Sequence, residues 1–113
     1  MALLVTGASG HVAWHVVTRA LDAGIAVVAP FRDAGPPPGR ERDGVTWVPC
    51  DLADAAAVAR LVDEHPVDAC LHAAAVSNEA YATPDPLAAV HANVGATANL
   101  LDAARRHGWR RLI

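Results

Sequence analysis

The most informative motif of this chain is Thr6-Gly7-Ala8-Ser9-Gly10-His11-Val12-Ala13. It follows a short apolar run over 2–6 and precedes a segment, 11–23, whose apolar residues recur at helical spacing. Gly7 permits a tight turn, Gly10 lets the backbone approach a ligand, and Ala13 lets the helix pack on the strand. Free N–H groups at the start of the helix favour a bound phosphate, so this strand–turn–helix unit predicts a dinucleotide site.

Apolar and helical segments alternate along the rest of the chain. Strands are expected over 25–31, 45–48, 67–71 and 110–113, and helices over 55–64 and 85–107. Pro30 cannot donate to a ladder, so pairing of the second strand is expected to end at Ala29. Composition predicts loops over 33–44 and 77–84. The long helix is expected to pack through an apolar stripe of Leu87, Val90, Val94, Ala98, Leu101 and Ala104.

This alternation predicts an α/β fold: a Rossmann-like, doubly wound parallel sheet with helices on both faces. Right-handed crossovers place the first strand centrally, so the strands, numbered along the chain, take the order 3-2-1-4-5. Residues 1–113 are interpreted as one NAD(P)-binding domain, truncated at the fifth strand.

Length, charge and composition exclude several classes of protein. The chain has 113 residues and a net charge of −3, which does not favour binding to nucleic acid. Its apolar runs are too short for a membrane span, and two cysteines are too few for a disulfide framework or a zinc site. The nine basic residues are all arginines, so Schiff-base chemistry and a Gly-Lys-Ser/Thr phosphate loop are excluded. No basic region precedes the apolar N-terminus, and a cytoplasmic protein is expected.

The end of the second strand bears on the choice of cofactor. An NAD site usually has an acidic residue there to bind the ribose, but this chain has Phe31 followed by Arg32. Arg32 is suited to pair with a 2′-phosphate, which slightly favours NADP. The alternative is that Arg32 is a solvated loop charge and that Asp33 binds the ribose.

Two further strand ends carry candidate residues. Asp51 either reaches an adenine amino group or caps the following helix, a role that Asp54 fills equally well. The small residues of His72-Ala73-Ala74-Ala75-Val76 let the backbone pass close to a ribose and diphosphate. His72 itself is expected to be a hydrogen-bonded structural residue.

Asn93 lies one position off the stripe of the long helix. It is expected to reach the loop after the fourth strand or the backbone of the fifth, with surface exposure as the alternative. The histidines are not at metal-ligand spacing with other ligands, and no metal site is expected.

Four motifs in this order resemble the N-terminal part of the NAD(P)-dependent epimerase/dehydratase family, the extended short-chain dehydrogenase/reductases. The motifs are 4–12, 50–52, 71–75 and 93–104, and the resemblance covers the whole chain. Similar members act mostly on nucleotide sugars by hydride transfer with a nicotinamide. The resemblance implies a cofactor site made of Gly7, Ser9, Gly10, His11, Val12, Phe31, Arg32, Asp51, Leu52, Ala73, Ala74, Ala75 and Asn93.

The resemblance also assigns parts of the cofactor to these residues. It implies backbone contacts to the diphosphate from His11 and Val12, and it places Phe31 and Arg32 beside the adenosine ribose. Adenine is implied between Asp51 and Leu52. The ribose–diphosphate stretch is implied along 73–75, with Asn93 as a support from the long helix.

The chain departs from the family in its catalytic residues. The family uses a Tyr-x-x-x-Lys pair, but Tyr81 is the only tyrosine here, Asp85 stands four residues later, and there is no lysine. No catalytic residue is therefore expected. We interpret the chain as the cofactor half of a longer enzyme, whether a fragment, a split gene product or a truncated gene model. Such a chain would take a nucleotide-sugar-like substrate only with the missing C-terminal part.

Two alternatives and one physical expectation accompany this interpretation. The first alternative is a non-enzymatic NAD(P)-sensing or regulatory module. The second, an S-adenosylmethionine-dependent methyltransferase, needs an acidic residue at the end of the second strand and is disfavoured. The apolar strand over 110–113 would leave an unpaired sheet edge, which predicts poor solubility or homo-oligomerisation.

Overall fold

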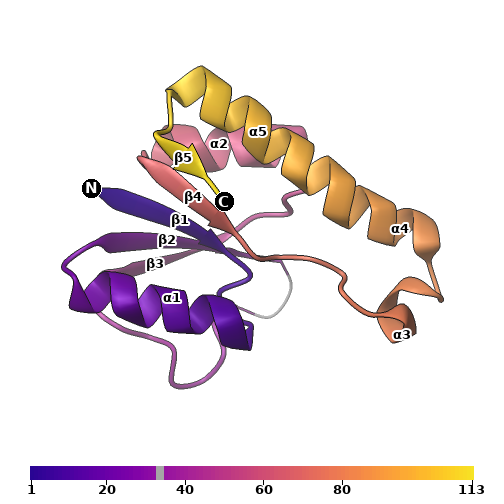
Figure 1. Ribbon diagram of the computed structural model, residues 1–113, viewed down its shortest axis with the longest axis horizontal. Helices are drawn as coiled ribbons and strands as arrows, with labels where there is room; N and C mark the ends of the chain where they lie inside the picture. The colour runs from indigo at the N-terminus through magenta and orange to yellow at the C-terminus, as the bar shows by residue number, and fades with distance from the viewer. Residues whose placement is uncertain (33–34) are drawn as a thin grey trace.

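Five parallel strands form one sheet, in the order β3-β2-β1-β4-β5, in the computed structural model, which describes residues 1–32 and 35–113. The strands are β1 (Ala2–Thr6), β2 (Ala26–Phe31), β3 (Val45–Pro49), β4 (Ala69–His72) and β5 (Arg111–Leu112). One face is covered by α1 (His11–Asp22), and the other by α2 (Ala55–Glu64) and α5 (Ala96–His107) (Figure 1). The predicted fold class and strand order are confirmed.

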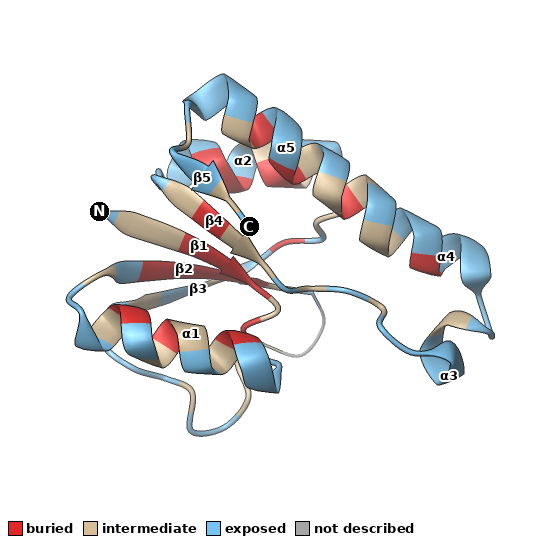
Figure 2. Cartoon of the chain, in the orientation of Figure 1, coloured by how far each residue is buried: buried red, intermediate tan, exposed pale blue. Residues whose placement is uncertain are grey.

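The core consists of two layers, one on each face of the sheet (Figure 2). Adjacent residues of the central strand serve both: Leu4 faces α2 and α5, and Val5 faces α1, and neither has exposed surface. The layer under α1 contains Val5, Ala8, Ala13, Val17, Ala20, Val27 and Ala29. The layer under α2 and α5 contains Leu4, Val28, Cys50, Val58, Leu61, Val62, Cys70, Leu100 and Ala103.

The expectation that pairing of β2 ends at Ala29 is wrong. Pro30 and Phe31 continue the pairing with β3. The Phe31 carbonyl accepts from the Cys50 N–H at 2.8 Å on the β3 side, so Pro30 directs its nitrogen toward β1. Pairing with β1 ends at Val28, and the N–H that Pro30 lacks is therefore not needed.

The predicted long helix is divided, and its predicted core stripe is wrong. The helix consists of α4 (Pro86–Val90), a π-helical turn η1 (His91–Gly95) and α5, and Gly108 ends it at φ +64°. Four residues of the predicted stripe are more than half exposed: Leu87, Val90, Val94 and Leu101. The buried positions of the helix are Ala89, Ala96, Leu100 and Ala103, three of them small residues.

Smaller differences lie near the ends of elements. The predicted loop over 77–84 contains a one-turn helix, α3 (Glu79–Ala82), capped by the Asn78 side chain. β4 begins two residues later than predicted. None of the helices in the described ranges has the length and apolar character needed to cross a bilayer.

The turn from β1 into α1 is held against the end of β4. Gly7 has φ +70°, a conformation that L side chains rarely adopt. A Cβ at this position would lie 2.9 Å from both Ala73 C and Ala74 N, which are backbone atoms. Glycine is therefore required at residue 7 for two independent reasons, conformation and space.

We predict that Gly7→Ala lowers the free energy of unfolding by about 2–4 kcal/mol, because it combines a strained φ with a backbone clash. Gly24→Ala is the matched control, since Gly24 has φ +73° and a Cβ added there would meet no atom within 4 Å. That variant is expected to lose only about 1 kcal/mol. Urea denaturation measures both values, and equal losses would contradict the role of the close approach.

Candidate cofactor site

Two adjoining hollows form a cleft at the carboxyl ends of the strands. The larger has a volume of about 570 Å³ and the smaller about 460 Å³. The two hollows share four lining residues and therefore form one continuous cleft. The shared residues are Gly7, Ser9, Ala74 and Ala75. The cleft lies where the connections after β1 and β4 leave toward opposite faces of the sheet (Figure 1), the position at which doubly wound folds bind ligands.

The smaller hollow is built around the start of α1. Its wall includes Gly10, His11 and Val12, all predicted from the sequence. Gly10 is the N-cap and has no side chain to satisfy the first N–H groups of the helix. A Cβ on Gly10 would lie 3.1 Å from the Gly7 carbonyl oxygen, so glycine at this position allows the tight turn. Free donors and a positive helix end make this hollow suited to a phosphate group.

The larger hollow lies between the ends of β2 and β3. Phe31, Arg32, Asp51 and Leu52 line it, as the sequence predicts. Asp33, the alternative ribose ligand, lies outside the described residues. An additional wall, Gly35 to Pro38, was missed because the sequence showed only an irregular loop there.

The two aspartates after β3 have separate roles. Asp54 caps α2, because its Oδ1 accepts from Ala56 N at 3.0 Å and from Ala57 N at 3.2 Å. Asp51 accepts from Ala53 N at 3.0 Å, stays exposed and lines the cleft. The alternative that Asp51 caps the helix is therefore wrong.

Asn93 and Asn99 hold two cleft segments from the helix above. Asn93 accepts from Val76 N at 2.7 Å and donates to Val76 O at 2.9 Å, so it clamps the loop after β4. Asn99 donates to Leu52 O at 2.8 Å, a contact that sequence reasoning missed. The π-helical turn places Asn93 against that loop, although Asn93 itself does not line the described cleft.

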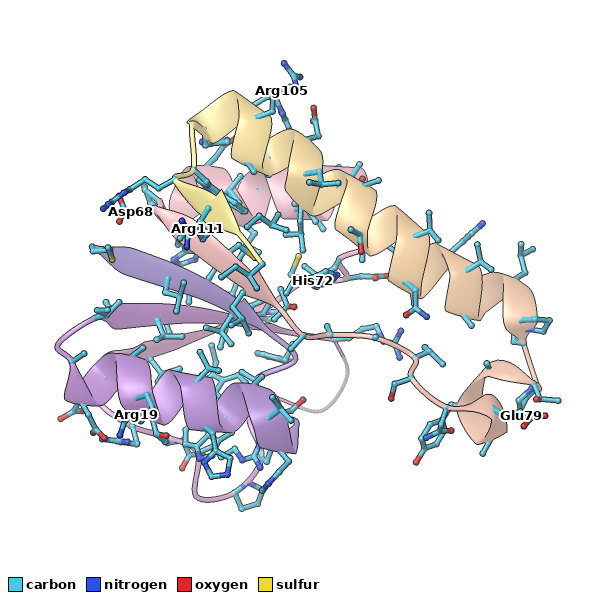
Figure 3. The ribbon with its side chains drawn as sticks, viewed as in Figure 1. Arg19, Asp68, His72, Glu79, Arg105 and Arg111 are labelled. Carbon is cyan, nitrogen blue, oxygen red and sulfur yellow. The ribbon has the colours of Figure 1, made fainter. Side chains whose placement is uncertain are left out.

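His72, at the end of β4 and labelled in Figure 3, connects three elements. Its Nδ1 lies 2.7 Å from Thr6 Oγ1 in β1, and its Nε2 lies 3.1 Å from Thr97 Oγ1 in α5. Thr6 Oγ1 also accepts from the N–H groups of Ala73 and Ala74, at 3.0 and 3.1 Å. His72 is therefore a structural residue with two partners, as the sequence predicts.

The hydrogen bonds around His72 fix its protonation. Thr97 Oγ1 lies 2.6 Å from the Asn93 carbonyl, which only accepts, so the Thr97 hydroxyl proton is committed there. His72 Nε2 must then carry the proton shared with Thr97. Both lone pairs of Thr6 Oγ1 accept from backbone N–H groups, so Thr6 donates to an unprotonated Nδ1. Burial also lowers the pKa of His72, which favours the same neutral form.

The two cysteines supply no reactive thiolate to the described site. Burial, with the Asp51 and Asp54 charges, raises the pKa of Cys50 to about 11, and burial raises that of Cys70 to about 12. Both thiols are therefore neutral near pH 7 and weakly nucleophilic. Tyr81 is 74% exposed on α3. Within residues 1–32 and 35–113, no three His, Cys, Asp or Glu side chains gather as metal ligands do.

We predict that His72 is a neutral Nε2–H tautomer. Long-range ¹⁵N–¹H correlation spectra distinguish the protonated ring nitrogen from the unprotonated one. The spectrum at pH 7.5 is expected to show the proton on Nε2 alone. A proton on Nδ1 would contradict the hydrogen-bond assignment.

His72→Phe is predicted to lower the free energy of unfolding at pH 8 by about 1–3 kcal/mol, because Thr6 loses its acceptor. The pKa of His72 is lower in the folded chain than its ordinary 6.5, so its stabilisation is complete above that pH and is lost as pH falls through the folded value. The difference between wild type and variant should therefore shrink below pH 6.5. His91→Phe, at an exposed position, is the control, and a pH-independent difference would contradict the prediction.

Comparison with known proteins places this cleft in a family context. Residues 3–113 match the sequence profile of the NAD dependent epimerase/dehydratase family. The chain is 31% identical, over 98% of its length, to probable UDP-arabinose 4-epimerase 3 of Arabidopsis thaliana. It is 36% identical, over 97%, to dTDP-glucose 4,6-dehydratase of Mycobacterium tuberculosis. It spans 29% and 34% of these relatives, about a third of their length.

The chain shares its fold with part of a sugar-nucleotide epimerase of known structure. The crystal structure of UDP-glucose 4-epimerase from Thermus thermophilus in complex with NAD has a TM-score of 0.88 and 29% identity. The match covers 99% of this chain and 36% of that one. Because the profile match extends over nearly all of its residues, the chain belongs to the NAD dependent epimerase/dehydratase family.

Proposed function

We propose that this chain is the NAD(P)-binding part of a sugar-nucleotide epimerase, dehydratase or reductase. The observation that carries the proposal is the continuous cleft that joins the uncapped start of α1 to the ends of β2 and β3. In a dinucleotide the diphosphate is joined to an adenosine, so the diphosphate would occupy the smaller hollow and the adenosine the larger. The solved relative with bound NAD supports this reading.

The residues of the cleft fit a dinucleotide in chemistry as well as in shape. The N–H groups of His11 and Val12 would hold the diphosphate, with Gly7, Ser9 and Gly10 leaving room for it. Phe31 and Arg32 would flank the adenosine ribose, and Asp51 and Leu52 the adenine. Along the other wall, the small residues 73–75 would let the cofactor lie close to the backbone. Asn93 would fix this wall through Val76.

The chemistry in such a site would come from the nicotinamide, which accepts and returns a hydride when bound. Sugar nucleotides are the proposed substrates, because the relatives named above act on UDP- and dTDP-linked sugars. The 113 residues have no lysine, and the only tyrosine lies on α3, outside the cleft lining that the structure describes. We therefore propose that this chain binds cofactor as one domain and does not turn over substrate by itself.

Arg32 favours NADP slightly over NAD in this proposal. Arg32 lines the larger hollow directly after Phe31, where a guanidinium would meet a 2′-phosphate. A non-enzymatic NAD(P)-sensing module is the second candidate, favoured by the exposed Tyr81 and the absence of lysine. Cytoplasmic location and homo-oligomerisation stay predictions from the sequence.

Titration of the purified chain with NAD⁺ and NADP⁺ by calorimetry tests the proposal. Wild type is expected to bind both, and Gly10→Val to bind neither, because its side chain would press on Gly7 O and fill the phosphate hollow. Arg32→Ala is expected to weaken NADP⁺ about tenfold with little change for NAD⁺, the loss of one charge-assisted hydrogen bond. Arg19→Ala, on the face of α1 turned away from the sheet, is the matched control (Figure 3).

Circular dichroism confirms that each variant is folded. Wild type without affinity for either dinucleotide would overturn the proposed function. Steady oxidation of NAD(P)H by this chain with a sugar nucleotide would overturn the proposed inactivity.

A further inference from the structure

Arg40 connects the loop between β2 and β3 to the glycine turn. Its Nη1 donates to the carbonyl oxygens of Ala8 and Gly10, each at 3.0 Å. The two carbonyls lie 32 and 30 residues away in the sequence, so these are tertiary contacts made by one guanidinium. Arg40 thereby fixes two carbonyl groups of the turn that lines the phosphate hollow.

Two tryptophans hold Arg40 in this position. The guanidinium lies over the Trp14 ring, 5.2 Å from its centroid, which is within the range of a cation–π interaction. Trp14 stacks on Trp47 with centroids 6.4 Å apart and planes at 20°. The Trp47 Nε1 donates back to the Arg40 carbonyl at 3.2 Å. Side chain and backbone of Arg40 are thus both anchored, the first to α1 and its turn and the second to β3.

The anchored residue is close to a wall of the cleft. Gly35 to Pro38 line the larger hollow, and the Arg40 N–H donates to the Pro37 carbonyl at 3.2 Å. Arg40 is not among the described residues that line either hollow. It therefore contacts two segments that line the cleft: the phosphate turn through its side chain and the proline wall through its backbone.

We propose that Arg40, with Trp14 and Trp47, is a latch that positions the proline wall against the phosphate turn and so sets the width of the adenosine end of the cleft. The inference rests on the proposed binding of NAD(P). Arg40 is a positioning residue in this account: it acts through the backbone of the turn and the wall, and not by contact with the cofactor. A loop of three prolines and two glycines between 35 and 39 has no regular structure to keep it in place, and the latch supplies that order.

The latch differs in a measurable way from a charge that reads the 2′-phosphate. A latch serves the parts that NAD⁺ and NADP⁺ share, so its loss weakens both to the same extent. A direct phosphate contact would affect NADP⁺ alone. Loss of the latch also loosens the loop in the absence of any nucleotide, which gives a readout that does not depend on binding.

The test compares three variants of the full chain. Arg40→Met is expected to weaken NAD⁺ and NADP⁺ by the same factor, about tenfold, because an anchor made of charge-assisted hydrogen bonds is lost. Trp47→Phe keeps the charge and removes the indole donor, and it is expected to weaken both by about threefold. Arg42→Met is the matched control: it removes one charge from the same loop, and only an exposed ion pair with Asp22 is lost.

Hydrogen exchange of the amides of residues 35, 39 and 40, which flank the three prolines and carry an N–H, is the second readout and is measured without nucleotide. Exchange is expected to be faster in Arg40→Met and Trp47→Phe than in wild type and Arg42→Met. If Arg40→Met does not fold, Trp47→Phe and Arg40→Lys, which keeps a cation near the two carbonyls, decide the question. Arg40→Lys is expected to restore part of the affinity.

The outcomes separate this inference from the proposed function. Wild type that binds neither dinucleotide overturns the proposed function, and with it any cofactor role for the latch. Wild type that binds, with Arg40→Met and Trp47→Phe unchanged in affinity and loop exchange, overturns the latch alone. A loss confined to NADP⁺ in Arg40→Met also overturns it, because the residue would then contact the 2′-phosphate directly.

Discussion

The turn after β1 packs directly on the backbone of the loop after β4, and this contact determines the position of the cleft. Gly7 lies against the backbone of Ala73 and Ala74 with no space for a side chain. The connection after β1 leads to α1 on one face of the sheet. The connection after β4 leads to α5 on the other face (Figure 1). The cleft begins where these two connections separate, so the contact of Gly7 with Ala73 and Ala74 lies at the edge of the site.

Hydrogen bonds of the neighbouring residues stabilise this contact. Thr6 is fully buried, and its hydroxyl serves His72 and two backbone N–H groups at once. Through His72 and Thr97 the network reaches α5, and the side chains of Asn93 and Asn99 hold the loops after β4 and β3. A buried hydroxyl with all its partners satisfied favours one arrangement of its neighbours, because each alternative leaves a polar group unpaired. The cleft is therefore supported by side chains that do not face it.

The sequence predicted those features that depend on local pattern. The glycine turn, the strand order and the cleft residues of the strand ends follow from short motifs and from the handedness of crossovers. Asn93 reaches the loop after β4, one of the two places predicted for it. The helix stripe failed because apolar spacing does not tell which of two adjacent faces meets the sheet: the larger residues Leu87 and Val94 face outward, and alanines face inward. Arg40 and Asn99 were missed because their roles arise from contacts 30 or more residues away, which no local pattern carries. The proline wall was missed because its sequence indicates only an irregular loop.

If the turn at the start of α1 holds a dinucleotide diphosphate, a crystal structure of the chain grown with NADP⁺ or NAD⁺ will show it there. Diphosphate oxygens are expected at about 2.7–3.2 Å from the N–H groups of His11 and Val12, with the adenosine between Leu52 and the proline wall. A dinucleotide bound elsewhere on the sheet, with the glycine turn in contact only with solvent, would contradict this assignment.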